Sequence, residues 1–253
     1  MAEIQEYIAR AREYGALRFD MIIADQMGKD WYDSSPQQSL PEREWCRQHI
    51  RNGDLVVDCG AHQGLMSLLF SFWAGDDGHV VAFEATRANA ELMSRNAALN
   101  GRTNIEVHAK AVGADDAVHS YVSVGGTAVL GPAAGIHGDA VDQTETIRLD
   151  RALAGRVPDF VKIDVEGYEA DVLRGAQASI ASLPNLDLEL HCLYFVDRRA
   201  YLEEILPLLP KEYLWYLQPE IFAQPEFVGR LDIDTLVKID NPHIFGVRVE
   251  PHR

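Results

Sequence analysis

The stretch DLVVDCGAHQGLMSLLFSFWAGDDGHVVAFE, at residues 54–84, constrains the fold of this chain more than any other segment. It holds an apolar run ending at Asp58, glycines at 60 and 64, an apolar helical pattern, and a second apolar run ending at Glu84. This order predicts a strand, a glycine turn, a helix and a second strand. Glycine allows such a turn to take positive φ and to approach a ligand closely. Because a carboxylate after the second strand can accept hydrogen bonds from a ribose, the segment indicates a site for a nucleoside-containing cofactor.

The glycine spacing favours a cofactor without a pyrophosphate. A dinucleotide site is typically G-x-G-x-x-G, but His62 and Leu65 stand where the second and third glycines would be. The observed D-x-G-x-x-x-G suits a smaller ligand, and S-adenosylmethionine (SAM) is the obvious candidate. Asp58 would then hold the ammonium group of its methionine part, and Glu84 its ribose. Two alternatives stay open: a nicotinamide-dependent oxidoreductase of the Rossmann type, and a non-catalytic module with the same fold.

The amino-acid composition restricts the kinds of partner that this chain could bind. It has 253 residues and a formal net charge of −16, which argues against nucleic acid because phosphate binding needs clustered lysine and arginine. The charge also argues against an anionic membrane surface, and no apolar run is long enough to span a bilayer. The N-terminus is charged and amphipathic, unlike a signal peptide. The three cysteines are widely spaced and fit neither a disulfide nor a zinc pattern, so we expect a reduced, cytoplasmic protein.

Hydrophobic periodicity divides the chain into two predicted parts. Residues 1–52 are expected to be a helical segment that caps the main body or contacts a partner subunit, which makes a homodimer plausible. The first helix rests on the helical spacing of Ile4, Tyr7, Ile8, Ala11 and Tyr14, and the second is expected over 41–51. Residues 53–253 would form the SAM-binding domain.

This second part alternates between strands and helices. We expect strands near 54–58, 79–84, 104–108, 159–164, 185–191, 212–217 and 243–249, and helices near 63–73, 87–99, 166–182 and 198–209. The alternation predicts a parallel α/β sheet covered by helices on both faces, in which the final strand could run antiparallel. Loop insertions near 123–145 and 218–242 interrupt it, and either could cover a substrate pocket. Runs at 118–124 and 146–149 are candidate extra strands.

Acidic residues and a histidine follow two later strands. In DFVKIDVEGYE, at 159–169, a strand delivers Asp164, and Glu166 opens the next helix. In DLELH, at 187–191, His191 ends another strand. Ligands of open α/β sheets lie beyond the carboxyl ends of the strands, so these side chains should meet the two acids of the first unit there. The sequence therefore predicts a catalytic rim, although Glu166 could equally serve only to charge a helix N-terminus.

Each of the other candidate site residues could serve the structure alone rather than the reaction. A histidine is more often structural than catalytic, and His191 rises above that expectation only through its place on the rim. His62, inside the glycine turn, is expected to shape the cofactor pocket. His137 lies in the first insertion and could meet the substrate. Trp31 and Tyr32 are expected to pack, or to form a lid over the cofactor.

Seven segments occur in the order seen in one family: VVDCGAHQG, VVAFEA, NAALNG, AKAVG, TIRLD, FVKIDVEGYEADVLRGA and LDLELH. Over roughly residues 50–195 the chain resembles the FkbM-type methyltransferases, within the Rossmann-like class I SAM-dependent fold. The resemblance implies a seven-stranded, mostly parallel sheet with helices on both faces and an antiparallel last strand. It also implies methyl transfer, usually to oxygen.

The resemblance implies roles for particular positions. The cofactor would be bound by Asp58, Gly60, Ala61, His62, Gly64, Glu84, Ala85, Lys110, Ala111 and Asp164. The methyl donor and acceptor would face Asp164, Glu166 and His191. The chain departs from the family at two positions, since asparagine is frequent at position 62 and proline at position 85.

We expect a hydroxyl of a small molecule, such as a sugar, a glycolipid or a secondary metabolite, to attack the methyl group. His191 is the first candidate for the base, because an unperturbed histidine has a pKa of about 6.5. Asp164 is the second candidate. A divalent metal is the alternative, with Asp164, Glu166, Glu189 and His191 as ligands. The sequence favours the metal-free reaction slightly, because it lacks a dense acidic cluster.

Overall fold

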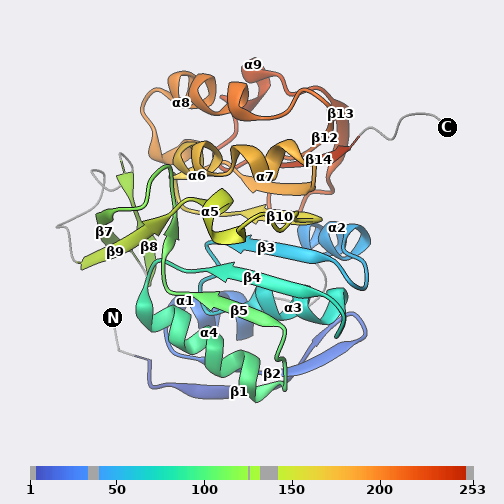
Figure 1. Ribbon diagram of the computed structural model, residues 1–253, viewed down its shortest axis with the longest axis vertical. Helices are drawn as coiled ribbons and strands as arrows, with labels where there is room; N and C mark the ends of the chain where they lie inside the picture. The colour runs from blue at the N-terminus through green and yellow to red at the C-terminus, as the bar shows by residue number, and fades with distance from the viewer. Residues whose placement is uncertain (1–3, 34–39, 125, 132–141, 249–253) are drawn as a thin grey trace.

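A large mixed sheet forms the body of the protein (Figure 1). The computed structural model describes residues 4–33, 40–124, 126–131 and 142–248. The strands, in spatial order, are Glu226–Gly229 (β13), Tyr213–Gln218 (β12), His243–Arg248 (β14), Asn185–Glu189 (β11), Phe160–Ile163 (β10), Leu55–Cys59 (β3), His79–Phe83 (β4) and Ile105–His108 (β5). The strands β5, β4, β3, β10 and β11 run parallel, and β14 is antiparallel to both of its neighbours, β11 and β12.

The expected strand positions and the antiparallel last strand are confirmed. The sheet has one strand more than the seven expected, because β13 forms within the predicted insertion at 218–242 and pairs with β12. The central strands are largely apolar because both of their faces are buried, and Asp58 in β3 and Lys162 in β10 are charged exceptions. Val56 packs with one core cluster and Val57, its neighbour in sequence, with the other.

Helices cover both faces of the sheet (Figure 1). They are Pro41–His49 (α2), Leu65–Ala74 (α3), Arg87–Leu99 (α4), Leu149–Leu153 (α5), Glu169–Gly175 (α6), Gln177–Ala181 (α7), Arg198–Ile205 (α8) and Ile233–Leu236 (α9). α2 and α3 pack in one apolar cluster with β3, β4 and β10, and α5, α6 and α8 pack in the other. Among the helices of the described residues, none has both the length and the apolar character that a bilayer crossing requires.

The start of the chain is a β-hairpin, so the predicted N-terminal helix is wrong. Tyr7–Tyr14 (β1) pairs antiparallel with Leu17–Ile23 (β2), and β2 contacts α4. Two asparagines, Asn96 on α4 and Asn100 directly after it, bind the backbone of β2. Asn96 Oδ1 accepts from the Ile22 N–H at 2.7 Å, and Asn100 Oδ1 accepts from the Asp20 N–H at 3.0 Å. The helix expected at 41–51 is present as α2. The division of the chain at residue 52 stays a prediction.

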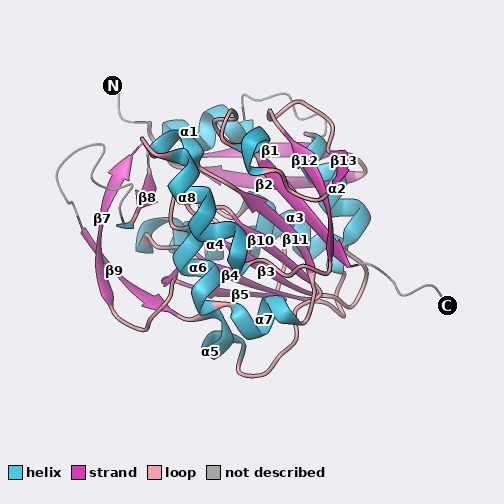
Figure 2. Cartoon of the chain, turned by 90° about the horizontal axis from the view of Figure 1, so that it is seen from above, coloured by secondary structure: helices cyan, strands magenta, loops and turns pink. Residues whose placement is uncertain are grey.

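The first insertion forms a second, smaller sheet that extends to one side of the main one (Figure 2). Its strands are Ala111–Val112 (β6), Asp142–Ile147 (β9), Val118–Val124 (β7) and Thr127–Val129 (β8). The candidate strand at 118–124 is present as β7, whereas the one expected at 146–149 begins earlier, as β9, and Leu149 already belongs to α5. His137 lies outside the described residues. Between β2 and α2, a short helix at Gln26–Gly28 (α1) and a π-helix at Lys29–Asp33 (η1) approach the glycine turn.

Candidate active site

A cavity of about 640 Å³ lies beyond the carboxyl ends of β3, β4, β10 and β11. Most of the predicted site residues line it: Asp58, Gly60, Ala61, His62, Glu84, Ala85, Ala111, Asp164, Glu166 and His191. Gly64 and Lys110 are not among its lining residues. Gly64 instead precedes α3 and packs against Met93, and Lys110 pairs with Glu145 away from the cavity.

The glycine turn depends on glycine for steric reasons. Gly60 has φ +87°, and a Cβ built there would lie 1.7 Å from the carbonyl oxygen of Asp164. The N–H groups of Gly60 and Ala61 both donate to the carbonyl of Phe83, which ties the turn to the end of β4. The turn is therefore held against the two strands that deliver Glu84 and Asp164.

Asp58 is fully buried at the end of β3. Its Oδ2 accepts a hydrogen bond from the Ser67 hydroxyl at 2.6 Å, whereas its Oδ1 has no hydrogen-bond partner among the described residues. Burial raises the pKa of Asp58 to about 6, against the opposing effects of Ser67 and Lys162. Asp58 thus offers an unused acceptor to a ligand in the cavity.

The Glu84 carboxylate is held by hydrogen bonds from Thr86 and from His62 of the glycine turn. Oε1 accepts from the N–H and the hydroxyl of Thr86, both at 2.8 Å, and Oε2 accepts from the His62 N–H at 2.9 Å. The same Thr86 hydroxyl accepts from the N–H of Asn89 and caps α4. The carboxylate is therefore oriented before any ligand arrives.

His62 joins the glycine turn to the π-helix. Its Nδ1 lies 2.7 Å from the Tyr32 hydroxyl, and both residues, with Trp31, line the cavity. Burial lowers the pKa of His62, although Glu84 and Asp25 oppose this. Trp31 and Tyr32 therefore lie at the cavity, and a role as a lid over the cofactor stays a prediction.

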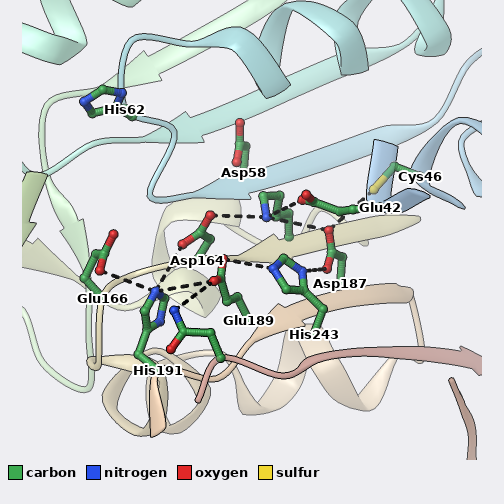
Figure 3. Close-up of polar contacts among 12 residues, drawn as sticks. Glu42, Cys46, Asp58, His62, Asp164, Glu166, Asp187, Glu189, His191 and His243 are labelled. Carbon is green, nitrogen blue, oxygen red and sulfur yellow. Dashed lines mark hydrogen bonds and ion pairs between the residues drawn. The ribbon is translucent and has the colours of Figure 1, made fainter. Parts of the chain in front are cut away.

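His191 lies at the centre of the rim (Figure 3). Its Nδ1 is 2.7 Å from Glu169 Oε1. Its Nε2 faces carboxylate oxygens of Glu166 at 3.4 Å, Asp164 at 3.8 Å and Glu189 at 3.8 Å. The structure thus brings the three predicted catalytic residues together.

Charge at the rim alters the expected role of His191. Burial alone would lower its pKa, but Glu189, Glu169 and Glu166 outweigh this and raise it to about 10. Burial and the nearby Glu189 carboxylate raise the pKa of Asp164 to about 7, although Lys162 opposes them. A protonated imidazole cannot accept a proton, so this arrangement favours His191 as a hydrogen-bond donor over a role as the base. Coordination of a metal by Nε2 would require the loss of this proton.

Lys162 links Asp164 of the rim to a second group of buried charges. Its Nζ lies 2.9 Å from Glu42, 3.4 Å from Asp164 and 3.6 Å from Asp187. His243 bridges Asp187, at 3.4 Å, and Glu189, at 3.1 Å. Despite burial, Glu189 and Asp187 raise the pKa of His243 well above its usual value, so two cations balance the acids beneath the rim.

The sequence analysis missed Arg43. This residue of α2 is buried and lines the cavity, and its Nε and Nη1 have no hydrogen-bond partner among the described residues. Its guanidinium lies over the Tyr14 ring, 4.9 Å from the ring centre. The cavity therefore contains an unused cationic donor as well as the unused acceptor of Asp58. The sequence offered little signal for it, because Arg43 is one of several charged residues on an amphipathic helix.

The sheet order, the glycine turn and the acids that follow β3 and β4 define a SAM-dependent methyltransferase of the class I fold. The sequence profile described as the methyltransferase FkbM domain matches residues 58–213, more than half of the chain. The chain belongs to this family. The residues present suit the family's cofactor, since the buried Oδ1 of Asp58 is an acceptor without a donor and the Glu84 carboxylate is already oriented.

Solved structures agree on the fold. A putative rRNA methylase from Clostridium thermocellum has a TM-score of 0.53 and 8% sequence identity, with 91% of this chain and 99% of that chain covered. An rRNA methylase from Streptococcus thermophilus has a TM-score of 0.51 and 10% identity, with 82% and 94% covered. At such identities the likeness concerns the fold alone. A comparison with curated protein sequences finds no match.

Proposed function

We propose that this methyltransferase transfers the methyl group to a hydroxyl oxygen of a small molecule. The main observation is that Asp164, Glu166 and His191 face the same cavity as Asp58 and Glu84. This arrangement puts groups that can hold and deprotonate a hydroxyl next to the predicted cofactor site. The net charge of −16 favours a small acceptor over RNA. A cytoplasmic location and a homodimer stay predictions from the sequence.

In this proposal the residues of the chain bind and orient both reactants. Bound SAM supplies an electrophilic methyl group on a sulfonium. Asp58 would accept hydrogen bonds from the ammonium group of the cofactor, Arg43 would pair with its carboxylate, and Glu84 would accept from its ribose. The rim would position the acceptor oxygen and take up its proton, so that catalysis rests mainly on orientation.

An acceptor screen tests the reaction type. We expect label from methyl-labelled SAM to enter hydroxyl-bearing small molecules, with the methyl position read by mass spectrometry. Amines, thiols and ribosomal RNA are the comparison acceptors. His191→Ala should lose turnover at least 100-fold while it still binds S-adenosylhomocysteine. Methylation confined to nitrogen, or to RNA, would contradict the proposal, and the absence of turnover on every class would favour a non-catalytic module.

Replacing Arg43 by alanine should weaken S-adenosylhomocysteine binding about tenfold. The reason is that the cofactor carboxylate would lose a buried cationic donor, and hydrogen bonds to charged groups contribute about 1.5–3 kcal/mol. Calorimetric titration measures the change, and Arg47→Ala on the exposed side of the same helix is the matched control. Equal affinities for the two variants would exclude Arg43 as the carboxylate partner.

Binding of S-adenosylhomocysteine should weaken as the pH falls below about 6, which is the raised pKa of Asp58. The ionised carboxylate is the form that accepts from the ammonium group, so protonation competes with binding and costs about tenfold in affinity per pH unit below that pKa. Lys162, Asp187, Glu42 and Ser67 surround Asp58. Titrations between pH 5 and pH 8 check the profile, with circular dichroism to verify folding. Asp58→Asn should bind weakly with a flatter profile; a variant with the wild-type slope would assign the titration to another group.

A further inference from the structure

The rim holds donor atoms at the spacing of a metal coordination shell. One ligand atom each from Asp164, Glu166 and His191 lie within 4.8 Å of one another. Donors bound at about 2.1–2.4 Å from a divalent cation are about 3.0–3.4 Å apart when adjacent and about 4.2–4.8 Å apart when opposite. The 3.4 Å separation from His191 Nε2 to Glu166 matches adjacent ligands, and the 3.8 Å separation to Asp164 lies between the two ranges.

His191 is oriented as a metal ligand would be. It is 2% exposed, and its Nδ1–H is directed at the Glu169 carboxylate. Glu169 is itself fixed, since it accepts from the Gly167 N–H at 2.9 Å and from the Tyr201 hydroxyl at 2.6 Å. A carboxylate that accepts from Nδ1 leaves Nε2 available to a metal and holds the ring in place. Nε2 points into the rim, where it lies 3.4 Å from the Glu166 carboxylate and 3.8 Å from those of Asp164 and Glu189.

The carboxylate that would face the cation is also oriented. Glu166 Oε2 accepts a hydrogen bond from the Tyr194 hydroxyl at 2.6 Å. Glu189 Oε1, 3.8 Å from His191 Nε2, adds further negative charge at the same point. Three carboxylates therefore converge on one imidazole nitrogen that faces the cavity.

We propose that Asp164, Glu166 and His191 bind a divalent cation of the Mg²⁺ or Mn²⁺ kind, which holds the acceptor oxygen of the transfer reaction. Carboxylate oxygens suit these hard cations, and a single imidazole is compatible with them. The role of the cation rests on the proposed function, because a metal there would orient a hydroxyl and lower its pKa.

The other cluster with metal-ligand types differs in a decisive way. Glu42, Asp187 and His243 also lie within reach of one another. There, however, the Lys162 ammonium lies 2.9 Å from Glu42 and 3.6 Å from Asp187, so it pairs with both carboxylates, whereas of the three rim residues it pairs with Asp164 alone, at 3.4 Å. All three are buried, so the lysine supplies the charge that a metal would otherwise bring. This contrast assigns the cation to the rim.

Manganese binding tests the proposal directly. We expect the electron paramagnetic resonance signal of free Mn²⁺ to fall when wild-type protein is added, and Mg²⁺ to restore it by competition. Glu166→Gln and His191→Ala should each weaken Mn²⁺ binding at least tenfold. Glu169→Gln, which acts through His191, should weaken it about 10-fold or more. Asp171→Asn on α6, whose carboxylate pairs with Arg174 instead, is the matched control and should bind as wild type does.

Binding of S-adenosylhomocysteine, measured by calorimetry on the same samples, separates this proposal from the proposed function. Wild-type protein that binds the nucleoside but not Mn²⁺ would overturn the cation site and leave the methyltransferase assignment standing. Protein that binds Mn²⁺ but not the nucleoside would count against the proposed function alone. Mn²⁺ binding unaffected by both Glu166→Gln and His191→Ala would place the cation elsewhere and overturn the site. Circular dichroism shows whether a variant is folded. If either Glu166→Gln or His191→Ala fails to fold, the other still tests the site.

Discussion

Replacing Lys162 with methionine is expected to lower the free energy of unfolding by about 3–5 kcal/mol. The side chain is 3% exposed, and its ammonium group lies within 3.6 Å of carboxylates from Glu42, Asp164 and Asp187. Methionine retains most of the volume but leaves these acids without their cation. Removing one partner of a buried ion pair is costly for this reason, even where the intact pair contributes little. Urea unfolding at neutral pH measures the loss.

An exposed lysine provides the control for this substitution. Lys110 pairs with Glu145, and Lys110→Met should change stability by less than about 1 kcal/mol. Combining Lys162→Met with Asp187→Asn should recover part of the lost stability, because one of the uncompensated charges is then absent. If Lys162→Met proves as stable as Lys110→Met, the buried charges are not balanced as the structure indicates.

Replacing Glu84 with alanine is expected to raise the dissociation constant of S-adenosylhomocysteine about 100-fold. Two hydrogen bonds from ribose hydroxyls to a carboxylate would be lost, and at the low end of their usual range, about 1.5 kcal/mol each, the loss corresponds to roughly 100-fold. The loop would also lose the contacts that Glu84 makes with His62 and Thr86, so the remaining ligand contacts would be less well oriented. Calorimetric titration gives the affinity.

Glu91 on α4 is exposed and provides the matched control, so Glu91→Ala should bind as wild type does. A thermal melt of Glu84→Ala separates lost binding from lost folding. Unchanged affinity in Glu84→Ala would remove the ribose contact from the proposed site. Wild-type protein without measurable affinity would instead count against the cofactor site as described.

The N-terminal hairpin formed by β1 and β2 explains why a helix was wrongly predicted from the sequence at this end of the chain. A strand normally alternates buried and exposed side chains, but β1 shifts register between Ala9 and Arg12, with Ala11 at φ +54°. Ala9 and Tyr14 are consequently both buried although five positions apart. The extra residue breaks the period of two, and the remaining apolar spacing imitates a helix. The α/β strands were predictable because buried parallel strands are continuous apolar runs.

The candidate site was predictable as far as strand ends determine it. Asp58 lies near the carboxyl end of β3, and Glu84, Asp164 and His191 come after strands, so their convergence was predictable from the topology. The pairings of these residues with more deeply buried groups could not be predicted. Glu42 and Lys162 are 120 positions apart in the chain, and Glu169 and His191 are 22 positions apart. Such pairings arise from packing, and they reversed the expected protonation of His191. The placing of Lys110 depended on the family resemblance, and its side chain pairs away from the cavity.

The strand order also determines when the chain can complete its fold. β3 lies between β4 and β10, and Val56 pairs with Phe160. The three strands β3, β4 and β5 can pair with one another early, but one edge of β3 stays open until β10 has been synthesised. An open edge of this kind is prone to pair with other chains. The same step places Lys162 opposite Asp58, so the buried ammonium group arrives before β11 and β14 bring Asp187, Glu189 and His243.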